Sequence, residues 1–291
     1  MRVKTTAAVA AGLLAGASAQ NSTATCADGV YLIVARGTTE PAGTGRIGSV
    51  ADGVVAAVPG SRIAPVDYPA VFVPYDGSVE NGTNAMKLQL TQYNSRCPNS
   101  KVALVGFSQG AQIVGDTLCG SIAENAAEGL DLDFDPTAPV PASIIDQSVI
   151  AAVLFGDPTH AANSSWDRGT SRRAGLFPRT NFTACQAYTP KIASWCDLGD
   201  KYCDASGNQP NNVTHGSYFG NYTEDAVDFI VAQFNASKAN GTSPTTPPPT
   251  TAPDSAAAAS APGFMVSLLT VSCPGSSTRV NLNLGIPHHL Y

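Results

Sequence analysis

The segment KVALVGFSQG at residues 101–110 constrains the fold most strongly, because it places a serine between two glycines directly after a continuous apolar run. Glycine weakens a strand interior and is found where the backbone turns sharply or where two segments pass close together. A strand, the pattern Gly-x-Ser-x-Gly and then a helix are typical of a nucleophile elbow. The segment therefore predicts that the hydroxyl of Ser108 is lifted above the end of a strand.

Similar apolar runs recur along the chain and are bounded by Gly, Pro or Asp, at residues 30–35, 101–107 and 149–155. Such runs are typical of strands that are covered on both faces, as in a parallel sheet. Apolar residues at helical spacing predict helices at 85–95, 109–119 and 223–234. The alternation predicts an α/β fold, a three-layer sandwich around a doubly wound and mainly parallel sheet.

The composition of the two ends predicts export. Residues 1–19 combine Arg2 and Lys4, a short apolar stretch and a small-residue cleavage site, as in a secretory signal peptide. We expect the globular domain at 20–236 and a Ser/Thr/Pro/Ala-rich linker at 237–262. The tail at 263–291 lacks the uninterrupted apolar terminus of a lipid-anchor signal and is expected to be disordered. The predicted location is extracellular.

Export makes disulfides the expected role of the cysteines. Cys273 stands alone downstream, and the pairing of the other six is open: Cys26, Cys97, Cys119, Cys185, Cys196 and Cys203.

Asn-x-Ser/Thr sites of an exported chain predict surface positions and glycosylation, here at Asn21, Asn81, Asn163, Asn181, Asn212, Asn221, Asn235 and Asn240. With 16 basic and 22 acidic side chains, the chain has no basic nucleic-acid face.

A serine hydroxyl is a weak nucleophile at neutral pH, so Ser108 requires a histidine that accepts its proton and an acid that orients this histidine. In elbow enzymes the chain order is serine, acid, histidine. His288 and His289 lie in the tail. His160 closely follows a predicted strand and is expected to be a solvated loop residue. His215 precedes the last helix and is the predicted base.

Among the aspartates that precede His215, four candidates could supply the acid, namely Asp157, Asp197, Asp200 and Asp204. Asp157 ends a strand, a place that suits a triad member and also a turn or helix cap. Asp200 lies between Cys196 and Cys203, and a disulfide between these two would fix its backbone in a small ring. A carboxylate in such a ring could orient an imidazole at a small ordering cost, but the ring could also be merely structural.

Taken together, the motifs resemble one family, the fungal and bacterial cutinases and the acetylxylan esterases grouped with them. The matching segments follow the family order across about residues 26–235: Ala35-Arg36-Gly37-Thr38-Thr39-Glu40, Tyr68-Pro69-Ala70, GFSQGA, Phe155-Gly156-Asp157-Pro158, CDLGDKYC, and His215 with Tyr218. The resemblance implies a lidless α/β-hydrolase with Ser108 as nucleophile, Asp200 as acid and His215 as base.

The resemblance also implies an oxyanion hole formed by the backbone N–H groups of Thr38 and Gln109, with the Thr38 hydroxyl as a further donor. It implies disulfides Cys26–Cys97 and Cys196–Cys203, which leaves Cys119 to pair with Cys185. We expect no cofactor and no metal, because His215 lacks a second histidine at helical spacing and the cysteines are explained as bridges.

The substrate stays open, because members of this family act on cutin polyester or on acetyl groups of xylan. Residues 201–214 contain Val213 as their only aliphatic side chain larger than alanine, and such a polar rim suits a hydrated carbohydrate. A glycan on Asn212 would shield the same side of the cleft and favour short or soluble esters. Residues 70–75 could instead form an apolar wall as in a cutinase, although Val71 and Phe72 could also belong to the core.

An alternative of a different class is a non-catalytic, carbohydrate-binding cell-wall protein on the same fold, because fold alone does not determine function. The complete set of triad and oxyanion positions argues against it. We therefore predict a secreted serine carboxylesterase of plant cell-wall material that acts through an acyl-enzyme, most directly on acetylxylan or short-chain esters. Its expected partner is the ester substrate, with no nucleic acid and no membrane, and it is expected to act as a monomer.

Overall fold

Six parallel strands form the centre of the protein, in the order β2-β1-β3-β4-β6-β5. The computed structural model describes residues 25–121, 132–205 and 212–239, which belong to one compact unit. The strands are β1 (Val30–Ala35), β2 (Arg62–Pro65), β3 (Lys101–Phe107), β4 (Val149–Phe155), β5 (Asp167–Arg168) and β6 (Ile192–Trp195). This sheet confirms the predicted α/β fold, and β1, β3 and β4 have the predicted bounds.

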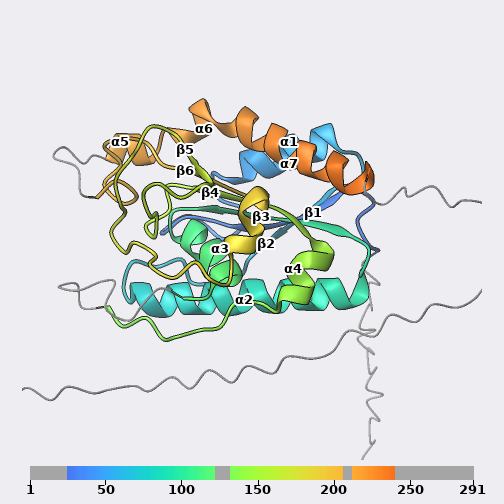
Figure 1. The fold of residues 1–291 in the computed structure, drawn as a ribbon, viewed down its shortest axis with the longest axis horizontal. Helices are drawn as coiled ribbons and strands as arrows, with labels where there is room; N and C mark the ends of the chain where they lie inside the picture. Colours follow the sequence, from blue (N-terminus) through green and yellow to red (C-terminus); the bar gives the residue numbers. More distant parts are fainter. Residues whose placement is uncertain (1–24, 122–131, 206–211, 240–291) are drawn as a thin grey trace, which may run out of the picture. The chain divides into compact units, whose positions relative to one another are not determined.

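Helices cover both faces of the sheet, with α1 and α7 on one side and α2, α3 and α4 on the other (Figure 1). They are α1 (Gly48–Ala57), α2 (Tyr75–Arg96), α3 (Gln109–Cys119), α4 (Ala142–Ser148), α5 (Asn212–His215), α6 (Tyr218–Asn221), α7 (Thr223–Ala239) and the 3-10 helix η1 (Gln186–Lys191). Side chains alternate along a strand, so Leu32 and Val34 enter the core beneath α1 and α7 while Ile33 enters the opposite core. Both faces are therefore apolar.

Helix α2 begins at Tyr75, much earlier than the predicted start at residue 85. Gly77 and Gly82 have low helix propensity and interrupt the apolar pattern. Tertiary packing explains Gly82, because a Cβ atom there would lie 2.2 Å from Cδ1 of Ile113 in α3. Glycine lets the two helices approach closely, and this contact compensates for the propensity. Helix α3 has the predicted bounds, and α7 runs to Ala239, past the predicted domain end at residue 236.

The turn between β3 and α3 explains the two glycines around Ser108. Ser108 has φ 56° and ψ −120°, in the positive-φ region that non-glycine residues rarely adopt. A Cβ atom on Gly106 would lie 2.2 Å from the carbonyl oxygen of Gly110, and one on Gly110 would lie 2.1 Å from the carbonyl oxygen of Ala35. Any larger residue at these positions would clash with backbone, so the crossing segments require glycine.

The described part of the chain contains three disulfides. Two have the pairing that the family resemblance implies, and the third joins the two cysteines that were left. Cys26–Cys97 joins the segment before β1 to the residue after α2, Cys119–Cys185 joins the end of α3 to the residue before η1, and Cys196–Cys203 closes the loop after β6. Cys273, the predicted signal peptide, the tail and all but the first residues of the predicted linker lie outside the described residues.

The asparagines of the glycosylation motifs whose side chains the structure describes lie on the surface. The exposed ones are Asn81, Asn163, Asn181, Asn221 and Asn235, which confirms their predicted surface positions. Asn21, Asn240 and the side chain of Asn212 lie outside the described residues. In the described ranges, no helix combines the length and the hydrophobicity that crossing a membrane requires.

Candidate active site

Ser108, His215 and Asp200 form a continuous chain of hydrogen bonds at the carboxyl ends of the strands. Nε2 of His215 lies 2.9 Å from Oγ of Ser108, and Nδ1 lies 2.8 Å from Oδ2 of Asp200. Ser108 follows β3, Asp200 lies in the loop after β6, and His215 ends α5. An Nδ1–H that donates to the carboxylate leaves Nε2 free to accept the hydroxyl proton of Ser108.

Asp200 is fully buried and held by several donors. Its Oδ1 accepts backbone N–H groups of Tyr202 at 2.8 Å and Cys203 at 3.2 Å, and its Oδ2 accepts the hydroxyl of Tyr218 at 2.6 Å. Burial raises the pKa of Asp200, but the hydrogen bonds from His215, Tyr218 and Tyr202 outweigh it and bring the pKa below its usual value. Asp200 is therefore a carboxylate at neutral pH.

Tyr218 supports this carboxylate from the buried side. Burial and the neighbouring Asp200 raise the pKa of Tyr218 above its usual value, so its hydroxyl stays protonated and can donate. The same oxygen accepts the backbone N–H of Asp197 at 3.2 Å. Together with the Cys196–Cys203 disulfide, Tyr218 therefore anchors both ends of the loop that carries Asp200.

The imidazole of His215 lies in a space that three neighbours define. The rings of Phe107 and Tyr202 have their centroids 4.9 Å and 4.4 Å from the imidazole centroid. Gly156 has φ +60°, and a Cβ atom there would lie 2.9 Å from Cε1 of His215. Sequence reasoning assigned no role to Gly156. The signal that could have found it is a glycine directly after a buried strand, where a positive φ or a close approach is expected.

The other candidate acids are engaged elsewhere. Oδ1 of Asp157 accepts the backbone N–H of Thr159 at 2.8 Å, within its own turn. Asp197 and Asp204 belong to the Asp200 loop, but their carboxylates accept hydrogen bonds from different partners: Thr170 and Tyr222 for Asp197, and Ser171 and Gly199 for Asp204. Of the four aspartates, the structure therefore brings Asp200 to His215.

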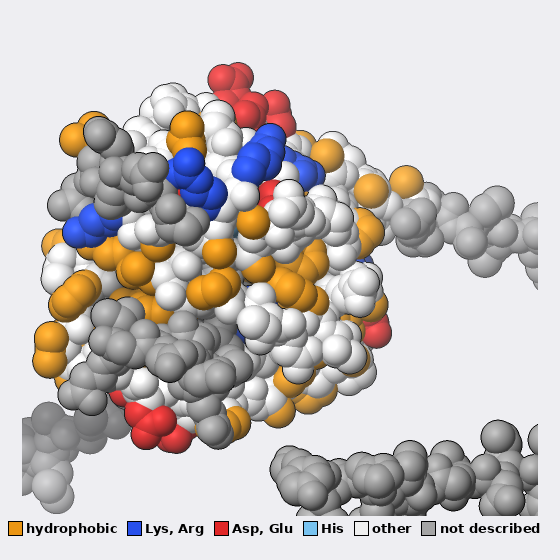
Figure 2. All heavy atoms as spheres, turned by 60° about the vertical axis from the view of Figure 1, so that its left-hand side comes forward, with side chains coloured by type: hydrophobic (Ala, Val, Ile, Leu, Met, Phe, Trp, Pro, Cys, Tyr) orange, Lys and Arg blue, Asp and Glu red, His pale blue; other side chains and the backbone are white. Residues whose placement is uncertain are grey.

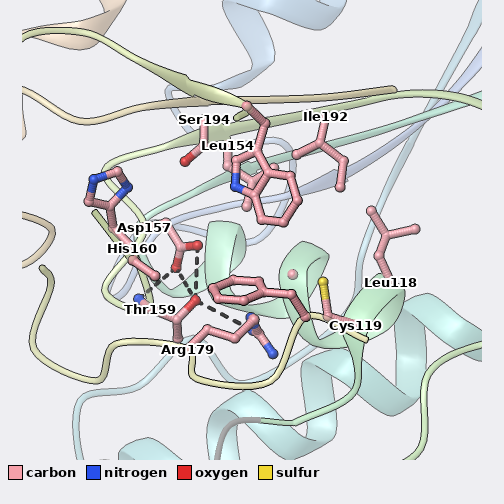
Figure 3. A pocket seen from close by; sticks show the side chains of 13 residues that line it. Leu118, Cys119, Leu154, Asp157, Thr159, His160, Arg179, Ile192 and Ser194 are labelled. Carbon is pink, nitrogen blue, oxygen red and sulfur yellow. Dashed lines mark hydrogen bonds between the residues drawn. The ribbon is translucent and has the colours of Figure 1, made fainter. Parts of the chain in front are cut away.

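His160 is buried, with 3% of its surface exposed, so the expectation of a solvated loop residue is wrong. Its Nδ1 lies 3.7 Å from a carboxylate oxygen of Asp167. With Asp157, Thr159 and Arg179 it lines a small cavity of about 20 Å³ that is separate from Ser108 (Figure 3). The position of His160 close after a predicted strand suggested a surface loop, whereas the segment folds inward and packs beside β4 and β6.

The predicted oxyanion donors come from neighbouring segments at the same edge of the sheet. Ala35 pairs with Gly106, so the loop after β1 that contains Thr38 and the start of α3 at Gln109 leave adjacent strands. The backbone N–H of Gln109 lies in the first turn of α3, where helical partners are lacking. Among the described residues, no turn or loop carbonyl accepts a backbone hydrogen bond from the N–H of Thr38 or Gln109.

Exposed apolar side chains lie on the segments that surround the candidate site. Val71, Phe72 and Val73 are 37%, 60% and 80% exposed, so Val71 and Phe72 do not belong to the core. The segments that carry Asp200 and His215 contribute Leu198 and Val213, which are 58% and 82% exposed. Figure 2 turns the side of Figure 1 that carries α5 toward the viewer and shows apolar side chains across the middle of this face. We call Val71, Phe72, Val73, Leu198 and Val213 the apolar rim.

The side chain of Gln109 connects the apolar rim to the nucleophile turn. Its Nε2 donates to the carbonyl oxygen of Val71 at 3.0 Å, and its Oε1 accepts the hydroxyl of Ser78 at 2.9 Å. The residue that follows Ser108 thus holds one wall of the surrounding surface. In the described ranges, no group of three or more His, Cys, Asp or Glu side chains is arranged to hold a metal ion.

Comparison with known proteins places these residues in a family. The family model for cutinase matches residues 26–234. Cutinase 11 of Verticillium dahliae is 33% identical over 224 residues, which cover 75% of this chain and 72% of the relative. Acetylxylan esterase 2 of Talaromyces purpureogenus is 33% identical over 208 residues, which cover 69% of this chain and 85% of the relative.

Among solved structures, the catalytic core domain of acetyl xylan esterase from Trichoderma reesei superposes with a TM-score of 0.62 at 32% identity, over 72% of this chain and 100% of that chain. A cutinase-like protein from Cryptococcus sp. shares the fold with a TM-score of 0.57 at 22% identity. This chain therefore belongs to the cutinase family of carboxylic ester hydrolases.

Proposed function

We propose that this protein is a secreted serine esterase that forms an acyl-enzyme on Ser108 and acts on short acyl esters, with the acetyl groups of xylan as the first candidate substrate. The observation that carries the proposal is the hydrogen-bond chain from Ser108 through His215 to Asp200, with contacts of 2.9 and 2.8 Å. Both distances lie within the reach that proton transfer between a nucleophile and its base requires.

Acylation begins when Oγ of Ser108 attacks the ester carbonyl carbon and Nε2 of His215 accepts the hydroxyl proton. The carbonyl oxygen becomes negatively charged and accepts hydrogen bonds from the N–H groups of Thr38 and Gln109. Asp200 stabilises the imidazolium that forms. The protonated Nε2 then donates to the leaving alcohol oxygen as the C–O bond breaks, which leaves the acyl group on Ser108.

Deacylation repeats these steps with water. Nε2 of His215 accepts a proton from a water molecule while its oxygen attacks the acyl carbonyl carbon, and the same N–H groups stabilise the second oxyanion. Collapse of this intermediate breaks the bond to Oγ, and Ser108 recovers its proton from Nε2. The products are a carboxylic acid and a free hydroxyl group on the substrate.

Two observations support acetylxylan as the first candidate substrate. Acetylxylan esterases are among the relatives at 33% identity, and the solved acetyl xylan esterase domain is covered over its full length. The stretch 201–214, which lies between Asp200 and His215, is mostly polar in sequence and suits a hydrated polysaccharide.

The apolar rim favours cutin polyester as a second candidate substrate. An aliphatic chain that covers the exposed side chains of Phe72, Val73 and Val213 would gain about 25 cal/mol for each Å² of apolar surface removed from water. The non-catalytic alternative finds no comparable support, because a binding protein does not require a buried carboxylate, an imidazole and a serine hydroxyl in hydrogen-bond sequence.

Hydrolysis of 4-nitrophenyl esters from acetate to palmitate tests this proposal. We expect kcat/KM to be highest with acetate, together with acetate release from acetylated xylan. A maximum at butyrate or longer would support the cutinase function instead, and Phe72→Ser should then lower kcat/KM for the long esters while leaving that for acetate unchanged. If the folded protein hydrolyses none of these esters, the proposed esterase function is wrong.

A further inference from the structure

Arg46 joins two loops of the candidate active site that are far apart in sequence. Its Nη2 donates to the carbonyl oxygen of Gly216, directly after His215, at 2.7 Å. Its backbone N–H donates to Oε1 of Glu40 at 3.1 Å. One residue thus contacts the loop that carries the predicted base and also the loop that carries the predicted oxyanion donor Thr38.

Glu40 holds the loop that carries Thr38. Its Oε2 accepts the backbone N–H of Gly37, next to Thr38, at 2.7 Å, and its carbonyl oxygen accepts Nε of Arg36 at 2.9 Å. A Cβ atom on Gly45, which has φ +59°, would lie 2.1 Å from Oε2 of Glu40, so this glycine makes room for the carboxylate. The position of Arg46 is therefore determined by the same carboxylate that holds the Thr38 loop.

The guanidinium of Arg46 is also held from a second side. It lies over the ring of Phe219, 4.3 Å from the centroid, in a cation–π contact. The Phe219 ring packs edge-on against Phe107 with centroids 4.9 Å apart, and Phe107 contacts the imidazole of His215 at the same separation. The aromatic rings that support Arg46 thus also support the imidazole.

The histidine turn has local hydrogen bonds of its own, but these do not place it relative to Ser108. The backbone N–H of Gly216 donates to Val213 and that of Ser217 to Thr214, both within the same turn. The bond from Arg46 to Gly216 spans 170 positions in sequence and connects this turn to the loop after β1. A planar guanidinium can donate to a carbonyl and stack on a ring at the same time, which an ammonium group cannot do equally well.

We propose that Arg46 is a positioning residue of the esterase, which holds the His215 turn in register with the oxyanion loop through Gly216, Phe219 and Glu40. It contacts no reacting atom. The proposal rests on the proposed function, because it assigns a role in the alignment of His215 with Ser108. Misalignment of a reacting group by about 1 Å can lower a rate by about 100-fold.

The test compares Arg46→Ala and Arg46→Lys with Arg62→Ala, using 4-nitrophenyl acetate. Arg62 donates to Thr25 on the exposed side of β2, so its removal makes the same change in charge away from the site. We expect kcat to fall by about 10- to 100-fold in Arg46→Ala with little change in KM. Arg46→Lys should recover only a small part of kcat, and Arg62→Ala should match the wild type.

The outcomes are separable from those that concern the proposed function. An Arg46→Ala protein with the kcat of Arg62→Ala would overturn the positioning role, whatever its Tm, whereas an inactive wild type would overturn the esterase itself. Full recovery of kcat in Arg46→Lys, or a loss that disappears at high salt, would show that Arg46 acts by its charge alone and would also overturn the proposal. If Arg46→Ala does not fold, the kcat of Arg46→Lys decides: a value far below that of the wild type supports the positioning role, and full recovery overturns it.

Discussion

Replacing Ser108 by alanine is expected to lower kcat for 4-nitrophenyl acetate by about 10⁶-fold, because the nucleophile of the proposed acyl-enzyme is lost. His215→Ala should cause a loss of similar size. The double variant should be no slower than either single variant, since the hydroxyl and its base act as one unit across the 2.9 Å contact. Steady-state rates of the purified wild type, both single variants and the double variant measure this directly.

Two controls test whether the loss of activity in Ser108→Ala is a loss of the nucleophile. A phosphonate ester that labels serine hydrolases should add one phosphonyl group to the wild type by mass spectrometry and none to Ser108→Ala. The variant should also keep the Tm of the wild type, because alanine tolerates the positive φ of this turn as well as serine does. A Ser108→Ala protein that retains more than a small fraction of the wild-type activity would show that another group is the nucleophile.

Asp200→Asn is expected to lower kcat by about 10⁴-fold while the fold is retained. The amide is close in shape to the carboxylate, but its N–H₂ group would face Nδ1 of His215 and favour the tautomer that carries the proton on Nε2. That tautomer cannot accept the proton of Ser108. The backbone N–H groups of Tyr202 and Cys203, which donate to the other side-chain oxygen, and the loop disulfide should still hold the side chain in place.

Asp197→Asn is the matched control for Asp200→Asn, because it makes the same chemical change in the same loop. The carboxylate of Asp197 accepts hydrogen bonds from Thr170 and Tyr222 rather than from His215. We expect it to lower the Tm and to leave kcat within a few-fold of the wild type. Equal losses of kcat in the two variants would mean that loop integrity, rather than orientation of the imidazole, explains the effect of Asp200→Asn.

The candidate site could be assembled from sequence only in part. Ser108 was predictable because its signal is local, a serine between two glycines after an apolar strand. His215 followed partly from chain order and partly from the family resemblance. The acid was open among four aspartates on chemical grounds, since Asp197, Asp200 and Asp204 share one loop. The family resemblance pointed to Asp200, and the structure shows the difference. The carboxylate of Asp200 lies 2.8 Å from Nδ1 of His215, whereas those of the other three aspartates accept hydrogen bonds from other groups.

The amino-acid sequence by itself determined β1, β3, β4, α3 and the turn at Ser108, because continuous apolar runs, helical spacing and paired glycines are signals within a few residues. Tertiary structure decided the early start of α2, the burial of His160, the exposure of Phe72 and the contact of Arg46 with Gly216. Each of these depends on how segments distant in the chain pack together, which no local pattern of residues records.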